Sequence, residues 1–94
     1  MSDSVVIIPT YNEIENIEAI IRAVFDLKKE FHILVVDDNS PDGTAKTVIE
    51  LQAEFPNLLH LEQREEKSGL GVAYIHGFKW ALNREYQYIF EMDA

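Results

Sequence analysis

The sequence predicts an α/β fold: a parallel sheet in the order βαβαβαβ, with helices on both faces. Short apolar runs recur along the chain, and longer segments with apolar residues at helical spacing separate them. This alternation is typical of βαβ units. The 94 residues are 47% apolar, which is enough for one modest core. We therefore expect a single unit over residues 1–94.

Four short segments rich in β-branched, aromatic or leucine residues are predicted to form the strands. They cover residues 5–8, 32–37, 58–62 and 86–92. Strands that are covered on both faces have this apolar character. No run approaches the roughly 20 apolar residues that span a bilayer. The start of the chain lacks the basic region of a signal peptide and there is no cysteine, so we expect a cytoplasmic location.

The first helix is expected over residues 13–28. Its apolar residues recur at the spacing of one helical face: Ile14, Ile17, Ile21, Val24 and Phe25. Asn12, with Glu15 three residues later, resembles a capping box at the start of this helix.

Two further helices are predicted between the later strands. The second follows Gly43 and ends before Pro56, because proline cannot continue a helix. The third covers residues 70–83. We expect its glycines to allow close packing on the sheet: Gly69, Gly71 and Gly77.

The charge balance limits the possible ligands. Eight Lys and Arg residues against seventeen Asp and Glu residues give a formal net charge of −9, which argues against a nucleic-acid binder. Arg64 and Lys67 flank Glu65 and Glu66, and such a mixture of charges indicates a solvated loop. An anionic ligand would therefore need a metal ion or a local cluster of cations.

The ends of the strands carry the unusual segments of the chain. Crossovers between parallel strands are right-handed, so the carboxyl ends of all four strands are expected along one edge of the sheet. Ligands of such sheets bind at that edge. The segments that reach it are Pro9-Thr10-Tyr11-Asn12-Glu13, Asp37-Asp38-Asn39-Ser40-Pro41-Asp42-Gly43-Thr44 and Asp93-Ala94.

Asp37 and Asp38 end the second predicted strand. Successive side chains of a strand point to opposite faces, so only one of the two can enter a given pocket. Asp38 shares its face with Val36, which would let Val36 pack against a flat ring while Asp38 accepts a hydrogen bond from that ring. The alternative for either carboxylate is to cap the turn that follows, and we favour this alternative for Asp37.

The segment after the first strand offers an aromatic and an acidic side chain. Pro9 fixes the direction in which the chain leaves the strand. Tyr11 can stack on a base or pack against its neighbours. Glu13 can bind a base or ribose, or it can stabilise the start of the helix through the helix dipole.

Asp93 follows the last predicted strand at the same edge. A hard cation such as Mg²⁺ or Mn²⁺ takes several oxygen ligands, so one carboxylate would need diphosphate oxygens beside it. The histidines His32, His60 and His76 do not have the spacing of metal ligands.

Four segments together carry a resemblance to a known family. They are Pro9-Thr10-Tyr11-Asn12-Glu13, Val35-Val36-Asp37-Asp38-Asn39-Ser40-Pro41-Asp42-Gly43-Thr44, Gly69-Leu70-Gly71-Val72-Ala73-Tyr74 and Met92-Asp93-Ala94. With these four segments in this order, the sequence resembles the family 2 glycosyltransferases with a GT-A fold. Within that family it is similar to the enzymes that transfer mannose to a dolichyl or polyprenyl phosphate. The resemblance covers essentially the whole chain.

The resemblance implies a site and a reaction. The residues expected to line the pocket for the nucleotide sugar are Pro9, Tyr11, Glu13, Val36 and Asp38. Guanine is the expected base and GDP-mannose the expected donor. Asp93 and Ala94 would begin the Asp-x-Asp motif that holds Mg²⁺ or Mn²⁺ and the diphosphate. The implied reaction is an inverting transfer to a polyprenyl phosphate, for which we name no catalytic residue because the attacking phosphate oxygen is already anionic.

Three rival hypotheses stay open at this point. Leu34-Val35-Val36-Asp37-Asp38-Asn39 is also similar to the acidic pair of a phosphoryl-accepting receiver domain, with Asp93 as phosphoacceptor. In a receiver that pair follows the first strand, whereas here it follows the second. The second hypothesis is a transferase that uses a UDP-sugar and a different acceptor, and the third is a binding module without catalytic activity.

The resemblance also predicts how the chain behaves. Because the metal motif is cut after its first aspartate, we expect an N-terminal fragment that is inactive by itself. The complete protein would act at the cytoplasmic face of a membrane. A parallel sheet that ends at its fourth strand exposes apolar surface and a strand edge, which predicts self-association.

Overall fold

The computed structural model describes residues 3–65 and 69–94 of the chain, so Lys67 lies outside the described residues. The predicted order of elements is confirmed, with boundaries that differ by a few residues. The elements are β1 (Ser4–Thr10), α1 (Ile17–Phe25), β2 (His32–Asp37), α2 (Thr44–Glu54), β3 (Leu59–Gln63), α3 (Leu70–Leu82) and β4 (Tyr88–Glu91).

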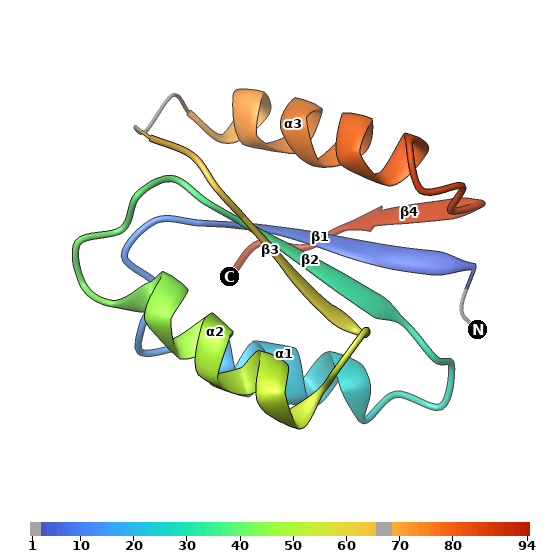
Figure 1. Ribbon diagram of the computed structural model, residues 1–94, viewed down its shortest axis with the longest axis horizontal. Helices are drawn as coiled ribbons and strands as arrows, with labels where there is room; N and C mark the ends of the chain where they lie inside the picture. Colours follow the sequence, from blue (N-terminus) through green and yellow to red (C-terminus); the bar gives the residue numbers. More distant parts are fainter. Residues whose placement is uncertain (1–2, 66–68) are drawn as a thin grey trace.

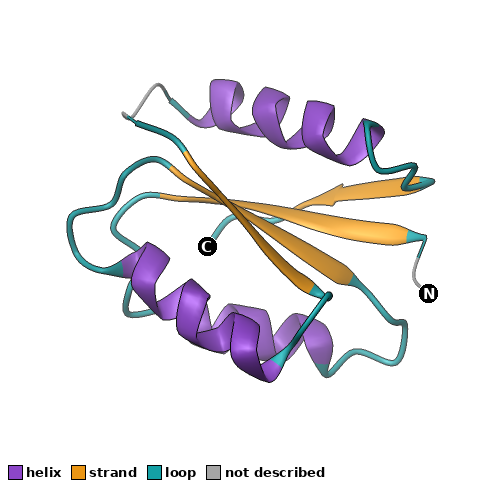
Figure 2. Ribbon diagram, viewed as in Figure 1, coloured by secondary structure: helices purple, strands orange, loops and turns teal. Residues whose placement is uncertain are grey.

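The four strands form one parallel sheet in the order β3-β2-β1-β4. Helices α1 and α2 cover one face and α3 covers the other, as Figures 1 and 2 show, which confirms the predicted architecture. The chain moves outward from β1 to β3 and then crosses through α3 to the far side of β1. The strand order therefore reverses between β1 and β4, the position at which such sheets bind ligands.

This strand order excludes the receiver hypothesis. A receiver sheet places its first strand between the second and the third. Here β1 lies between β2 and β4 instead. The acidic pair after β2 therefore has a different neighbourhood from the acidic pair of a receiver.

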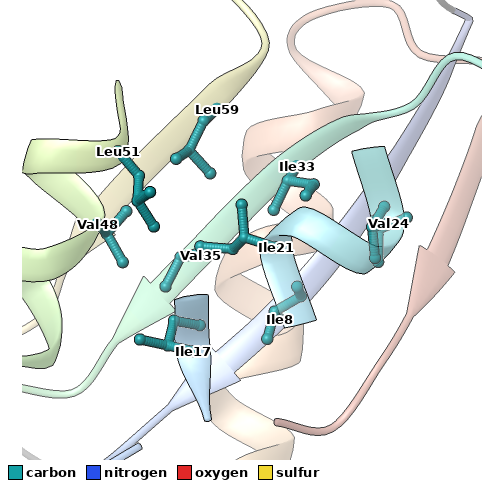
Figure 3. Close-up of a cluster of buried hydrophobic side chains, with 10 residues drawn as sticks. Ile8, Ile17, Ile21, Val24, Ile33, Val35, Val48, Leu51 and Leu59 are labelled. Carbon is teal, nitrogen blue, oxygen red and sulfur yellow. The ribbon is translucent and has the colours of Figure 1, made fainter. Parts of the chain in front are cut away.

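Two apolar layers hold the helices against the sheet. Alternate residues of β1 and β2 point to opposite faces, so each strand contributes to both layers. The layer under α1 and α2 is built from Val6, Ile8, Ile17, Ile21, Val24, Ile33, Val35, Val48, Leu51 and Leu59, most of which are labelled in Figure 3. The layer under α3 is built from Val5, Ile7, Leu34, Val36, Ala73, Trp80 and Ala81.

The glycines of the third helix differ in what they do. A Cβ atom at Gly77 would lie 2.7 Å from Cγ2 of Ile7, which confirms the close packing expected there. Close packing was wrong for Gly69 and Gly71, because a Cβ atom at either would meet nothing within 4 Å. Gly69 instead has a φ of 99°, a backbone conformation that favours glycine at the start of α3.

The predicted start of the first helix was wrong. α1 begins at Ile17, and its N-cap residue Asn16 makes no side-chain capping hydrogen bond. Asn12 has a φ of 57°, so it turns the chain before the helix and does not form a capping box with Glu15. Among the described residues, no helix is long and apolar enough to cross a membrane.

Candidate functional site

A pocket of about 200 Å³ lies at the carboxyl edge of the sheet. It is lined by Pro9, Thr10, Tyr11, Glu13, Asp38, Gly69 and Ala73. These residues come from the end of β1 and the segment that follows it, the first residue after β2 and the start of α3. The structure thus brings together four of the residues that the sequence singled out for ligand binding.

Asp37 and Asp38 have different surroundings, as the alternation of side chains predicts. The carboxylate of Asp37 is buried and accepts hydrogen bonds from Thr10 Oγ1 at 2.7 Å, Ser40 Oγ at 2.6 Å and Ser40 N at 2.9 Å. These bonds tie the ends of β1 and β2 to the following loop. Asp37 therefore has the structural role that we favoured, while Asp38 faces the pocket.

Asp38 forms an ion pair with Arg64, a residue that sequence reasoning missed. Arg64 Nη1 lies 3.3 Å from Asp38 Oδ1, and the two side chains are only 15% and 6% exposed. The backbone N–H of Arg64 donates to Asp37 O at 2.7 Å, which extends the pairing of β3 with β2 by one residue. The expectation of a solvated loop was therefore wrong for Arg64.

A second hollow of about 400 Å³ lies at the carboxyl ends of β2 and β3. It is lined by Asp37, Asn39, Ser40, Ala45, Gln63, Arg64 and Glu65. Asp38 lines one hollow and Arg64 lines the other, so the ion pair links the linings of the two. Arg64 supplies a local cation at an edge that is otherwise rich in carboxylates.

The loop after β2 caps the segment after β1. Three consecutive backbone N–H groups donate to it: Asn12 to Ser40 Oγ at 2.9 Å, Glu13 to Thr44 Oγ1 at 3.1 Å, and Ile14 to Asp42 Oδ2 at 3.1 Å. Burial favours the neutral form of Asp42, but hydrogen bonds from Thr44 and the Ile14 amide outweigh it and lower the pKa of Asp42. The two loops that form the pocket are thus joined.

The other residues predicted for the nucleotide pocket differ in their exposure. Tyr11 lines the pocket and is 37% exposed, so a ligand can reach this residue. Glu13 is half-buried at the pocket wall, and its carbonyl oxygen accepts the first helical hydrogen bond of α1, from Ile17 N at 2.8 Å. Val36 has no exposed surface and packs in the layer under α3, so contact of Val36 with a base stays a prediction.

Asp93 follows β4, whose pairing with β1 continues through a hydrogen bond from Met92 N to Ile7 O at 3.0 Å. Its Oδ1 accepts a hydrogen bond of 2.8 Å from the hydroxyl of Tyr74 on α3. Burial, together with this bond and the charge of Asp93, raises the pKa of Tyr74 to about 12, so the phenol remains a donor. Ala94 instead packs against the layer under α1 and α2.

The residues present fit a divalent metal only as a partial ligand set. Within residues 3–65 and 69–94, no three His, Cys, Asp or Glu side chains gather into a metal site. Mg²⁺ and Mn²⁺ bind carboxylate and phosphate oxygens together. Asp93 is therefore suited to hold such an ion as one carboxylate ligand beside a diphosphate.

Comparisons with known proteins place this geometry in context. A family model described as glycosyl transferase family 2 matches residues 5–94. The polyprenol monophosphomannose synthase of Mycolicibacterium smegmatis is 50% identical over 91 residues, which are 97% of this chain and 34% of that protein. The undecaprenyl-phosphate mannosyltransferase of Micrococcus luteus is 49% identical over 88 residues, which are 94% of this chain and 36% of that protein. The chain thus spans about a third of the length of these relatives.

A solved structure gives the same comparison in three dimensions. The mannosyltransferase PcManGT from Pyrobaculum calidifontis, in complex with GDP-Man and Mn²⁺, aligns with a TM-score of 0.78 and 29% sequence identity. The alignment covers 83% of this chain and 24% of that one.

Proposed function

The chain belongs to glycosyl transferase family 2 and has the GT-A type of fold, and we propose that it binds GDP-mannose for transfer of mannose to a polyprenyl phosphate. The observation that carries this proposal is the convergence of Tyr11, Glu13 and Asp38 on one pocket beside the point where the strand order reverses. The names of the relatives support mannose and a polyprenyl phosphate acceptor, and the bound GDP-Man of the structural neighbour supports the donor.

The pocket offers complementary groups for a guanine nucleoside. Guanine presents a ring N–H and an exocyclic amine side by side, and the Asp38 oxygen that does not pair with Arg64 can accept hydrogen bonds from this edge. Tyr11 can stack on the face of the base. Glu13 lines the same pocket and can accept hydrogen bonds from ribose hydroxyls. Uracil offers only a single ring N–H, so this arrangement favours guanine.

Asp93 is the residue that would hold a divalent metal with the diphosphate. When bound, the metal stabilises the negative charge of the departing diphosphate. The attacking phosphate oxygen of the acceptor is already anionic, so no residue of this chain is needed to remove a proton from it. A bond forms between that oxygen and the anomeric carbon as the bond from this carbon to the diphosphate breaks, which inverts the anomeric centre.

We also propose that transfer takes place at the cytoplasmic face of a membrane. A polyprenyl phosphate is anchored in the bilayer by its hydrocarbon chain, whereas a nucleotide sugar is dissolved in water. A site that serves both must face the surface of the membrane.

Isothermal titration calorimetry of the chain with GDP-mannose and UDP-glucose, each with and without Mn²⁺, tests the donor. We expect binding of GDP-mannose that Mn²⁺ strengthens. Replacement of Tyr11 by Leu should weaken it about tenfold through loss of stacking. Tyr88→Leu, at an exposed tyrosine of β4, is the matched control and should leave binding unchanged.

Other results of these binding experiments would lead to other conclusions about the donor and the site. A clear preference for UDP-glucose would reassign the donor to a UDP-sugar. Binding of neither nucleotide sugar would overturn the proposed site. A protein as long as the relatives could bind GDP-mannose and yet transfer no mannose to a polyprenyl phosphate. That result would indicate a binding module without catalytic activity.

A further inference from the structure

Helix α3 contacts both parts of the proposed donor site. Gly69 and Ala73 line the pocket that Tyr11 and Asp38 form. The next residue, Tyr74, donates a hydrogen bond to the carboxylate of Asp93 on the other side of the strand reversal. Two successive residues of one helix therefore lie against the nucleotide pocket and against the acidic side chain after β4.

We propose that Tyr74 is a positioning residue that orients the Asp93 carboxylate for a divalent metal. This inference rests on the proposed function. The hydroxyl of Tyr74 binds Oδ1 of Asp93 at 2.8 Å, which restrains the carboxylate and leaves its second oxygen for the ion. A metal ligand held in this way loses less conformational freedom when the ion binds.

The packing of Tyr74 makes it suited to this role. Its ring is half-buried against the layer under α3 and stacks on the ring of Phe78, with 6.3 Å between the ring centroids and 22° between the planes. Asp93, in contrast, lies beyond the end of β4 and is exposed. The packed side chain of Tyr74 thus orients the exposed carboxylate of Asp93.

A purely structural role would predict a different result from a substitution. A hydrogen bond at an exposed carboxylate contributes little to folding, so its loss should leave the thermal unfolding midpoint almost unchanged. Loss of a residue that orients a metal ligand, however, typically weakens metal binding about 10- to 100-fold. The two roles therefore separate when metal affinity and folding stability are measured on the same variant.

The experiment compares Tyr74→Phe, which keeps the ring and removes the hydroxyl, with Tyr88→Phe as control. Mn²⁺ affinity in the presence of GDP is measured by electron paramagnetic resonance, and GDP affinity without metal is measured by calorimetry. For Tyr74→Phe we expect Mn²⁺ affinity to fall about tenfold, while metal-free GDP affinity and the thermal unfolding midpoint stay at the wild-type values. Tyr88→Phe should match the wild type throughout.

A double-mutant cycle with Asp93→Asn tests whether Tyr74 acts through Asp93. Once Asp93 is replaced, removal of the Tyr74 hydroxyl should have no further effect on Mn²⁺ affinity. Wild-type Mn²⁺ affinity in Tyr74→Phe, or additive effects in the cycle, would overturn the role of Tyr74 alone. Failure of the wild-type chain to bind GDP and Mn²⁺ would overturn the proposed function, and the role of Tyr74 with it.

Discussion

Asp38 and Arg64 form an ion pair at the carboxyl edge of the sheet, with 3.3 Å between Asp38 Oδ1 and Arg64 Nη1. The pair joins the end of β2 to the end of β3, and both side chains are largely withdrawn from water. Charges in such surroundings are little screened by salt. The pair therefore stabilises the same carboxylate that we propose to bind the base.

Replacement of Arg64 by Met should destabilise the fold by about 3 kcal/mol, because it removes a cation from beside the buried Asp38 carboxylate. Arg22→Met is the matched control. Arg22 also pairs with carboxylates, Glu18 and Glu54, but all three side chains are exposed, so we expect a clearly smaller loss. Urea unfolding measures both losses of stability, provided that the dependence of the unfolding free energy on urea concentration is the same in the variants and the wild type. Equal losses in the two variants would contradict the assigned burial of the Asp38–Arg64 pair.

Thr44→Val should also destabilise the fold, by about 1–2 kcal/mol. The hydroxyl of Thr44 accepts from the Glu13 amide at 3.1 Å and donates to Asp42 Oδ1 at 2.5 Å, so the substitution releases the segment after β1 from the loop after β2. Thr47→Val makes the same chemical change one turn further along α2. Urea unfolding should show a clearly smaller effect for Thr47→Val, and a comparable one would refute the capping role.

Much of the fold was predictable because the signals for it are local. The apolar runs indicated the strands, and Pro56 together with Gly43 indicated the limits of the second helix. The start of α1 was not predictable in this way. Its preceding amides are capped by Ser40, Asp42 and Thr44, which are far away in the sequence, so the local pattern at Asn12 and Glu15 was misleading.

Among the residues that line the pocket, Asp38 was expected at this edge because it directly follows a strand and precedes a recognisable turn. Arg64 directly follows β3 and so reaches the same edge, but its neighbours Glu65 and Glu66 resemble a solvated loop. The signal available in the sequence was the position of Arg64 close to the end of a predicted strand. The charged residues around Arg64 instead favoured the interpretation as a solvated loop. The strand order, which places Asp38 beside Arg64, arises only from long-range packing.

The stability of the fold should fall as pH decreases below about 6.5. Burial, and then the nearby charges of His32 and Arg84, lower the pKa of His60, and burial also lowers the pKa of His32. The unfolded chain therefore binds protons more readily than the folded one. The contribution of these histidines is fully present above the unfolded pKa of about 6.5 and is lost as pH falls toward their folded pKa values.

His60→Phe should reduce this dependence, because the ring of His60 packs on Trp80 with 5.0 Å between centroids and a phenyl ring can occupy the same place without titrating. Urea midpoints from about pH 8 to about pH 5.5 provide the measurement. An unchanged slope in His60→Phe would show that His60 is not a source of the acid sensitivity.

The wild-type chain is expected to self-associate through β4, which forms one edge of the sheet. Tyr88, Phe90 and Met92 are 54%, 45% and 38% exposed, and an apolar groove beside them is lined by α1 residues such as Val24 together with Met92. An exposed apolar strand edge is a template for pairing with another chain.

Phe90→Lys should therefore shift the chain toward the monomer, because it places a charge at the edge. Ile49→Lys, which adds the same charge at an equally accessible site on α2, should not. Light scattering over a range of concentrations distinguishes the two, and a wild-type chain that stays monomeric throughout would refute association through this edge.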